Sequence, residues 1–425
     1  MNKKTRNKVI IIICILVLLL VAILGYLKYK DDKYKELLQK QEMMALKQKK
    51  EQEAKLLNTI KTNYHEYVKI IQDTKLYKMA QQEYVEAGQV NKGTDLVLER
   101  RENLTIDDQY FKLANLDYYV FYKDITPTEK QTVDTHYKSY IPFDTNIITK
   151  IPTNFYKDDT LAFSINESIQ APIIINDSSY YYIEFDNRLL GIKKDNVEKT
   201  IEVKNNIAVA TNIGVLNYHF FYNSNAGESC NEIICLETSK FEEQLKYLKD
   251  NNFYTATMND FSLWMRKKIQ LPKKTAVITV DDGAMGTSTH LISLLEKYDL
   301  HGTLFLITAW WPKDNYVSNN LEVQSHGHDI HDFTKSIHPA LTMTKEQLLA
   351  DFKQSISSLN GEKTAFCYPF YAHNQTVRNA VKEAGFEIAF VGGNVKSNQY
   401  NDPYQIRRYV IYSYTTLNQF INMVN

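Results

Sequence analysis

Hydrophobic and polar positions divide the chain into three regions with different periodicities. The first is an apolar run from Val9 to Leu27 that contains no charged residue. The second, at about residues 75–205, alternates short Tyr- and Ile-rich runs with turn residues, which is typical of β structure. The third, from about residue 212, alternates apolar runs of strand length with helical segments. The pattern predicts a long helical start, a β region and an α/β domain.

The apolar run is long enough for a transmembrane helix, because a bilayer core needs about 20 apolar residues. Residues 1–8 contain four basic side chains. This positive charge predicts that residues 1–8 stay in the cytoplasm while the bulk of the chain lies outside. A cleaved signal peptide is the alternative, but it requires small residues at a cleavage site, which the segment 25–28 (Gly-Tyr-Leu-Lys) does not offer. We therefore interpret residues 9–27 as the signal anchor of a single-pass membrane protein.

Residues 28–74 are predicted to form a helical stalk. No Gly or Pro occurs between Gly25 and Gly88, and the segment from Asp31 to about Asn58 is dominated by strong helix formers. A coiled-coil dimer is the alternative, although no heptad pattern persists. At about 1.5 Å per residue, such a stalk would hold the rest of the chain tens of ångströms from the membrane.

Two stretches of the β region, 118–125 and 189–197, look alike. Each follows an aromatic run and contains Lys-Asp before an aliphatic residue. This spacing resembles two tandem bacterial SH3-like barrels over residues 75–205, and such modules often contact cell-wall polymers. The alternative is a small β domain that only positions the rest of the protein, with its aromatic residues in the core.

Composition and charge narrow the classes of function. A chain of 425 residues allows two or three domains, and its 44% hydrophobic and 24% charged residues are typical of a globular protein. The 50 basic and 50 acidic residues leave no net charge, which argues against a nucleic-acid partner. No nucleotide cofactor is expected. Cys230 and Cys235 either form a disulfide outside the membrane or are two small buried thiols.

The C-terminal region is predicted to be α/β. Strands that alternate with helices indicate a parallel sheet or a β/α barrel, in which active residues gather at the C-terminal ends of strands. Helices are expected at 239–249, at 289–297 and after Thr344, which suits an N-cap. The expected strands are 215–218, 276–280, 303–307, 321–325, 364–367, 387–391 and 409–412.

Polar residues follow two of these expected strands. Asp281 and Asp282 come directly after 276–280, and His326, His328 and His331 follow 321–325. Adjacent carboxylates after a buried strand are costly unless a cation or a proton separates their roles. An Asp with two His is a common catalytic metal set that leaves a position open for water. Each group alone fits an exposed loop, but together they predict a metal site.

These motifs resemble those of the polysaccharide deacetylases of carbohydrate esterase family 4. The family's Thr-Phe-Asp-Asp-Gly motif corresponds to 279–283 (Thr-Val-Asp-Asp-Gly), and its His motif to 325–331. Its aromatic-Pro-Tyr motif corresponds to 366–370 (Phe-Cys-Tyr-Pro-Phe), and a leading Tyr-His element to 217–219. The resemblance implies a deformed β/α barrel over 206–425, preceded by the β domains, the stalk and the transmembrane helix.

The resemblance implies that Asp282, His326 and a later His bind a divalent metal, usually zinc. In many members the two His are four residues apart, and Ile occupies that position here. His331 lies five residues on, a spacing that resembles the poly-N-acetylglucosamine deacetylase branch, and His328 is the alternative ligand. Gly327 stands where the family favours Thr or Ser, so a supporting hydrogen bond would be lost.

The resemblance also assigns catalytic roles. Asp281 would be the general base that takes a proton from the attacking water. The usual late His acid is absent, so His219 of the leading element would act as the acid; the alternative is a buried His that caps a strand. Arg408 resembles the late Arg that tunes the catalytic Asp, with Arg407 as the alternative because adjacent strand residues face opposite ways. Substrate and oxyanion contacts are expected at Tyr368, Pro369 and Phe370.

The predicted function is therefore that of a membrane-anchored, extracellular, metal-dependent deacetylase. It would hydrolyse N-acetyl groups of N-acetylglucosamine-type glycans of the cell envelope, either peptidoglycan or poly-N-acetylglucosamine. The first alternative is a cell-wall glycan-binding protein whose metal site has lost turnover. The second is a metal-dependent deacylase of another amide or ester. The base beside the metal set speaks against a pure binder.

Overall fold

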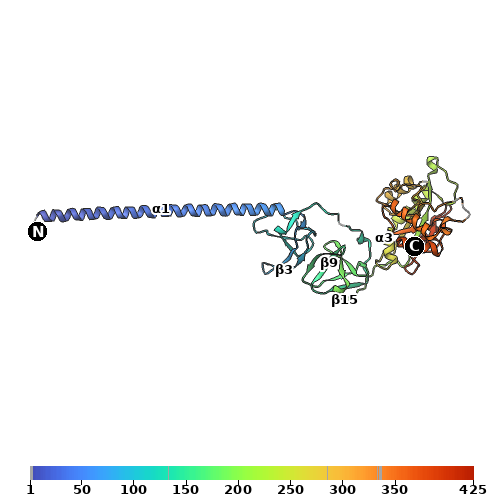
Figure 1. Cartoon of the computed structure of the whole chain (residues 1–425), viewed down its shortest axis with the longest axis horizontal. Coiled ribbons are helices and arrows are strands. Elements are labelled where there is room, and N and C mark those ends of the chain that lie inside the picture. Colours follow the sequence, from blue (N-terminus) through green and yellow to red (C-terminus); the bar gives the residue numbers. More distant parts are fainter. Residues whose placement is uncertain (1–2, 133, 285, 333, 335–336) are drawn as a thin grey trace. The chain divides into compact units, whose positions relative to one another are not determined.

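The structure is a computed structural model that describes residues 3–132, 134–284, 286–332, 334 and 337–425. Residues 1–2, at the start of the expected cytoplasmic segment, lie outside the described residues. The chain divides into two compact units, Met1–Thr132 and Val133–Asn425 (Figure 1). Each unit has buried apolar residues of its own.

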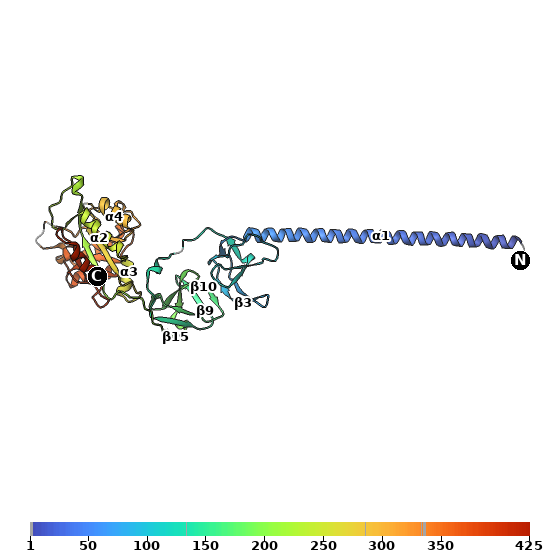
Figure 2. The same cartoon turned by 180° about the vertical axis from the view of Figure 1, so that it is seen from behind.

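The first unit begins with one continuous helix, α1 (Lys3–Asn63), the long blue helix of Figures 1 and 2. Apolar side chains between Val9 and Leu27 are exposed along it. By length and composition this helix could cross a membrane. A row of exposed apolar side chains of this size is unfavourable in water and favourable in lipid. The expected apolar helix is therefore present.

The helix ends at Asn63, and β1 (Tyr67–Ile70) follows, so β structure begins before the expected end of the stalk at residue 74. The local pattern explains the difference, because Val68 and Ile70 are buried while Tyr67 and Lys69 are only partly buried, which is the period-2 pattern of a strand. The Asn63 side chain donates a hydrogen bond to the Tyr122 carbonyl at 2.9 Å, which ties the helix end to this unit.

The β part of the first unit contains two antiparallel sheets, ordered β4-β1-β7 and β3-β2-β6-β5. Leu76, Phe111 and Val120 form part of its buried core. Its remaining elements are β2 (Thr74–Ala80), β3 (Glu83–Val90), β4 (Asp95–Val97), β5 (Tyr110–Lys112), β6 (Tyr119–Phe121), the 3-10 turn η1 (Tyr122–Asp124) and β7 (Ile125–Pro127).

The second unit opens with the 3-10 turn η2 (His136–Ser139) and a second β module, whose strands are ordered β12-β13-β14-β9-β10 and β11-β8-β15. The alike stretches 118–125 and 189–197 both fold as strand, 3-10 turn and strand. The SH3-like assignment stays a prediction. The module contains β8 (Thr145–Thr149), β9 (Thr153–Lys157), β10 (Thr160–Ile165), β11 (Gln170–Pro172), β12 (Ile175–Asn176), β13 (Tyr180–Phe185), β14 (Arg188–Lys193), η3 (Lys194–Asn196) and β15 (Val197–Glu202).

A parallel β barrel forms the rest of the second unit, with the order β16-β25-β24-β23-β22-β21-β20. The barrel closes because β16 pairs with both β20 and β25. Its strands are almost wholly buried, as expected for parallel strands covered on both faces. They are β16 (Gly214–Tyr218), β20 (Thr275–Asp282), β21 (Gly302–Leu306), β22 (Leu321–Ser325), β23 (Ala365–Cys367), β24 (Ile388–Gly392) and β25 (Ile406–Val410), with β19 (Tyr254–Thr255) beside β20.

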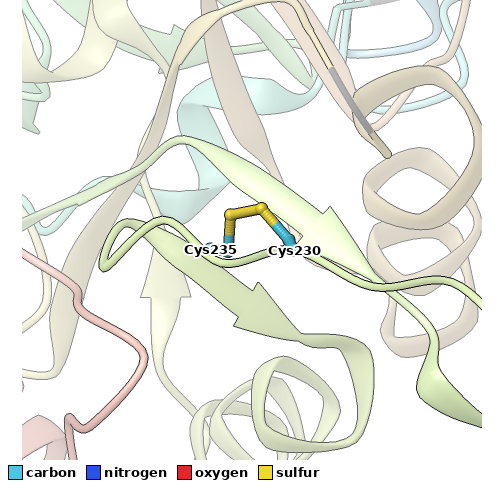
Figure 3. The surroundings of a disulfide bond; sticks show 2 residues. All are labelled: Cys230 and Cys235. Atoms are coloured by element: carbon cyan, nitrogen blue, oxygen red, sulfur yellow. A yellow bond between two sulfur atoms is a disulfide. The ribbon is translucent and has the colours of Figure 1, made fainter.

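The expected helices are confirmed, and Thr344 is an N-cap whose side chain accepts a hydrogen bond from the Gln347 backbone. Cys230 and Cys235 form a disulfide next to β18 (Figure 3). The helices are α2 (Thr238–Asp250), α3 (Met258–Met265), η5 (Thr287–Leu291), α4 (Ile292–Tyr298), α5 (Lys345–Ser358), α6 (Gln375–Ala384) and α7 (Leu417–Val424); the other elements are β17 (Phe220–Tyr222), η4 (Ser224–Ala226), β18 (Cys235–Glu237), η6 (Lys313–Asn315), η7 (Pro339–Leu341) and η8 (Pro369–Tyr371).

Candidate metal and catalytic centre

The C-terminal ends of the barrel strands bring the candidate residues together. Asp281 and Asp282 end β20, His326 follows β22, and His219 follows β16. Arg408 reaches the same place from within β25. In a parallel barrel all strands point the same way, so residues far apart in sequence meet at one rim.

Asp282, His326 and His331 are buried and have ligand atoms within 4.8 Å of one another. Oδ1 of Asp282 lies 3.4 Å from Nε2 of each His. His328, the alternative ligand, instead places Nδ1 3.0 Å from Thr308 Oγ1. The structure therefore brings together the three residues expected from the motifs. Asp281, His326 and Cys367 form an overlapping group, but Asp281 is already paired with Arg408.

The tautomer of His326 is fixed by its surroundings. Its Nδ1 lies 2.8 Å from the Cys367 carbonyl oxygen, which accepts hydrogen bonds only. Nδ1 therefore donates this hydrogen bond, and Nε2 is the nitrogen that faces Asp282. This arrangement, with the second ring nitrogen held by a carbonyl, is typical of metal-binding His.

The loop between the two His is also fixed. Gly327 has φ +84°, a conformation that favours glycine, and a Cβ there would lie 2.7 Å from Ile330 Cγ1. Asp351 of α5 accepts hydrogen bonds from the backbone N–H of His328 and Asp329 at 2.8 and 2.7 Å. The Thr or Ser that the family favours at position 327 would be strained in this loop, which gives a physical reason for the glycine.

Asp281 is held by Arg408, whose Nη1 and Nη2 donate to its two carboxylate oxygens at 2.8 and 2.7 Å. Both side chains are buried, whereas Arg407 is exposed. Burial alone would raise the pKa of Asp281, but the charge and hydrogen bonds of Arg408 outweigh it and hold that pKa below its usual range. Asp281 is therefore ionised at neutral pH, as a base must be.

His219 lies beside Asp281, with Nε2 4.0 Å from Asp281 Oδ2. Among the described residues, its buried Nδ1 has no hydrogen-bond partner. Burial lowers the pKa of the imidazole. His219 is thus a neutral ring beside the candidate base, and its Nδ1 does not serve as a strand cap.

The third motif contributes a strained turn. Phe370 and Tyr371 have φ values of 55° and 57°, in the left-handed region that non-glycine residues rarely adopt. The Phe370 ring packs between His331 and His338, with both ring centroids 4.2 Å away. Strain of this kind is stored where the surrounding structure over-determines it. Phe370 is therefore held against the metal set.

Tyr368 does not direct its side chain to the centre. Its ring packs in a hydrophobic cluster with Phe366, and its hydroxyl donates to the Tyr404 carbonyl at 3.2 Å. Pro369 is buried at the start of the strained turn. A substrate contact of the Tyr368 side chain, expected from the motif, is not supported by this placement, because its hydroxyl is bound elsewhere.

Two residues of the centre were not expected. Cys367 is buried and places Sγ 2.9 Å from Arg408 Nη2 and 3.5 Å from Asp281 Oδ2. Tyr371 donates its hydroxyl to Asn217 Oδ1 at 2.6 Å and lies over Gly392, where a Cβ would clash with its ring. The sequence signal for Tyr371 is its position, since it directly follows the third motif at 366–370.

The donor set of Asp282, His326 and His331 fits a divalent cation. It offers one carboxylate and two imidazoles, the ligand types that Zn²⁺ prefers in catalytic sites. The proton position on His326 also leaves the correct nitrogen free to coordinate. Three protein ligands would leave a coordination position for water or substrate.

Comparison with known proteins places these residues in a family context. Residues 268–389 match the family model described as polysaccharide deacetylase. The matched range contains Asp281 and the three candidate ligands, whereas His219 and Arg408 lie outside it. The resemblance inferred from the motifs is thereby confirmed.

A poly-beta-1,6-N-acetyl-D-glucosamine N-deacetylase of Staphylococcus aureus (strain MSSA476) is 25% identical over 232 residues, covering 48% of this chain and 79% of the relative. Among solved structures, IcaB from Ammonifex degensii is 19% identical, with a TM-score of 0.43 over 51% of this chain and 97% of that chain. The polysaccharide deacetylase BC0361 from Bacillus cereus is 19% identical, with a TM-score of 0.42 over 71% of this chain and 94% of that chain.

Proposed function

We propose that this chain is a membrane-anchored, metal-dependent hydrolase that removes N-acetyl groups from an N-acetylglucosamine polymer of the cell envelope. Residues 268–389, which match the polysaccharide deacetylase family model, support this proposal. One observation carries the proposal: a carboxylate kept ionised by a buried Arg, Asp281, stands beside a buried set of metal-ligand type. A binding protein has no need of a base at this position.

Asp282, His326 and His331 would hold the cation, with zinc as the first choice for this donor set. When bound, the cation supplies Lewis-acid chemistry toward the acetamide carbonyl and the attacking water. The backbone N–H of Phe370 is the proposed second donor to the oxyanion, since its ring is packed against His331.

Proton transfer is assigned to Asp281 and His219. Asp281 takes a proton from the attacking water, whose oxygen bonds to the carbonyl carbon. Because burial lowers its pKa, His219 is neutral at rest, and the proton it delivers must come from the reaction. Asp281, 4.0 Å from its Nε2, is the source. The C–N bond breaks as His219 protonates the amine, which leaves acetate and a free glucosamine unit.

Poly-β-1,6-N-acetylglucosamine is the favoured polymer. The Staphylococcus aureus relative is named for it, and the five-residue spacing from His326 to His331 is that of the same branch. Peptidoglycan is the second candidate, since a stalked, anchored enzyme would lie close to the cell wall. The apolar stretch of α1 would anchor the chain, with the basic first residues inside and the deacetylase domain outside.

The test is acetate release by the full chain in detergent with added zinc. The substrates are β-1,6-linked N-acetylglucosamine oligomers and, separately, purified peptidoglycan. The Asp282→Asn variant is expected to lose release and to bind zinc at least roughly tenfold more weakly. Asp314→Asn, at an exposed carboxylate of η6, is the matched control and should retain both.

Release from the oligomers that disappears only in Asp282→Asn would support the proposal. Release from peptidoglycan alone would reassign the polymer. No release from either substrate by a folded, zinc-binding sample would overturn the enzymatic proposal in favour of a glycan-binding protein.

A further inference from the structure

The mouth of the barrel carries exposed aromatic rings that the proposed chemistry does not use. Trp310 and Trp311, in the loop after β21, are 39% and 40% exposed, and Tyr414, after β25, is 63% exposed. Isolated apolar residues on a surface need no explanation, but large rings gathered around one site mark a binding surface.

The Trp pair adjoins the metal set. The ring of Trp310 lies 5.4 Å from that of His331, nearly perpendicular to it. Trp311 lies beside Gly283, the residue after Asp282, with Cδ1 3.4 Å from where a Cβ would stand. The backbone N–H groups of both Trp donate to the Ile307 carbonyl, so a tight turn fixes the pair.

The Tyr pair is equally well ordered. The rings of Tyr412 and Tyr414 are stacked 5.2 Å apart and within 9° of parallel. Ser413, between them, donates its N–H to the carbonyl of Ile233, which lies inside the loop closed by the disulfide of Figure 3. The carbonyl of Ser413 accepts a hydrogen bond from the Lys240 side chain at 2.6 Å. The loop that carries the pair is therefore held from both sides.

Strand order places the two pairs on opposite sides of the mouth. Between β21 and β25 the barrel has β22, β23 and β24 in one direction and β20 and β16 in the other. Asp281 and Asp282 lie on β20, and the metal-binding His326 follows β22. The candidate centre thus lies between the Trp pair and the Tyr pair.

We propose that the Trp pair and the Tyr pair are two sugar-binding platforms that hold one neutral glycan chain across the centre. The proposal rests on the proposed function, and it specifies the substrate as an internal unit of a chain of several sugars. Aromatic faces suit pyranose rings, because the axial C–H groups of a sugar present an apolar face that leaves its hydroxyls in water. Because the two platforms follow strands on opposite sides of the mouth, a chain of several sugars can contact both at once.

The test compares kcat and KM for β-1,6-linked N-acetylglucosamine oligomers of one to six units, with the full chain in detergent and added zinc. Trp311→Ala and Tyr414→Ala are each expected to raise KM for the longest oligomer by roughly three- to tenfold, with a smaller effect on kcat. KM for the monosaccharide should change little. Tyr414→Phe keeps the ring and should restore the wild-type KM.

Tyr400→Ala is the matched control. Tyr400 is 86% exposed and lies over Lys267, and Ser397 nearby pairs with Ile213 ahead of β16, at the other end of the barrel. Its KM should stay at the wild-type value for every length.

Failure of the two proposals can be distinguished. If the wild type releases no acetate at any length, the proposed function fails. If it releases acetate but KM is the same for all lengths, or the platform variants match Tyr400→Ala, the platforms are wrong. A fall in kcat at constant KM would also overturn them, because such residues would act in the chemistry rather than in holding the chain.

Discussion

Arg408 is fully buried in the barrel, and its guanidinium is paired with the carboxylate of Asp281. Breaking a buried pair leaves an uncompensated charge, which typically costs about 3–5 kcal/mol. Arg408→Met is therefore expected to reduce the free energy of unfolding by about that amount. Without the positive charge of Arg408, the pKa of Asp281 should rise. Asp281 would then be protonated at acidic pH, so the variant should lose activity there first.

Tryptophan fluorescence during urea unfolding measures this loss of stability. The signal reports on the second unit, which contains Arg408, because Trp264, Trp310 and Trp311 all lie in that unit. Arg407→Met is the control, since its exposed side chain should contribute within about 0.5 kcal/mol. Equal stability of the two variants would show that the Arg408 pair does not hold this site.

Gly327 lies in the loop between His326 and His331. Replacing it with Ala adds a Cβ 2.7 Å from Ile330 Cγ1 and strains a backbone with φ +84°. The loop must shift, and the loop sets the distance between His326 and His331. We expect zinc affinity, measured by competition with a chelator, to fall by roughly 10- to 100-fold.

Gly361→Ala separates this effect from backbone strain alone. Gly361 has φ +90°, but no atom of the residues that the structure describes lies within 4 Å of where its Cβ would stand, and Gly361 is far from the His loop in sequence. This variant should lose stability by about 1 kcal/mol and keep its zinc affinity. Equal zinc binding by both glycine variants would contradict the role assigned to the loop.

At the scale of elements, η2 is attached to α3 by His136 and Asp260. His136 Nε2 lies 2.8 Å from Asp260 Oδ1, and the hydroxyls of Tyr140 and Tyr254 donate to the same carboxylate. The hydrogen bond to Asp260 raises the pKa of His136. Burial opposes ionisation of Asp260, but these hydrogen bonds outweigh it and lower its pKa to about 2.

The sign of the pH dependence follows from these shifts. A His whose pKa is raised on folding stabilises the fold fully below its unfolded value of about 6.5, and this contribution disappears as the pH rises through the folded value. The Asp260 contribution is present above about pH 4 and is lost as the pH falls toward about 2. Between about pH 4 and 6.5 both are present.

We therefore expect the wild type to unfold at a higher temperature at about pH 6 than at about pH 8.5, and His136→Gln to lose most of that difference. Lys138→Gln, on the same 3-10 turn and paired with Glu184, is the control. This variant keeps the hydrogen bond between His136 and Asp260, so it should retain the difference. An unchanged pH dependence in His136→Gln would mean that another group titrates.

In the whole molecule, α1 has one part that suits lipid and one part that suits water. Its stretch Val9–Leu27 exposes apolar side chains. The part from Asp31 onward instead carries exposed ion pairs such as Lys35–Asp31 and Lys40–Glu36. We expect the full chain to sediment with membranes and to be released by detergent but not by high salt, since burial of apolar area is insensitive to screening.

Removal of residues 1–30 should leave the protein in the soluble fraction, with its zinc binding and its unfolding temperature unchanged. Removal of residues 1–8 is the control and should leave membrane association intact. Release of the full chain by salt alone would contradict a membrane-spanning α1.

Local patterns in the sequence predicted the apolar helix, the candidate Asp and His residues and most strands of the barrel. These follow from local properties: buried parallel strands are continuous apolar runs, and a catalytic metal set requires particular side-chain types close to strand ends. The last strand was expected at 409–412 and is Ile406–Val410. The predicted end of the stalk was wrong, because no Gly or Pro before Gly88 marks the end of the helix, whereas the burial of Val68 and Ile70 favours a strand.

Which of several candidate residues come together depends on the tertiary structure. It brought His331 rather than His328 to Asp282, selected Arg408 over Arg407, and moved the Tyr368 side chain out of the centre. It also brought Cys367 beside Asp281 and closed the Cys230–Cys235 disulfide. Residues so far apart in sequence come within hydrogen-bonding distance only through strand order and register, and these depend on packing of the whole barrel rather than on any local pattern.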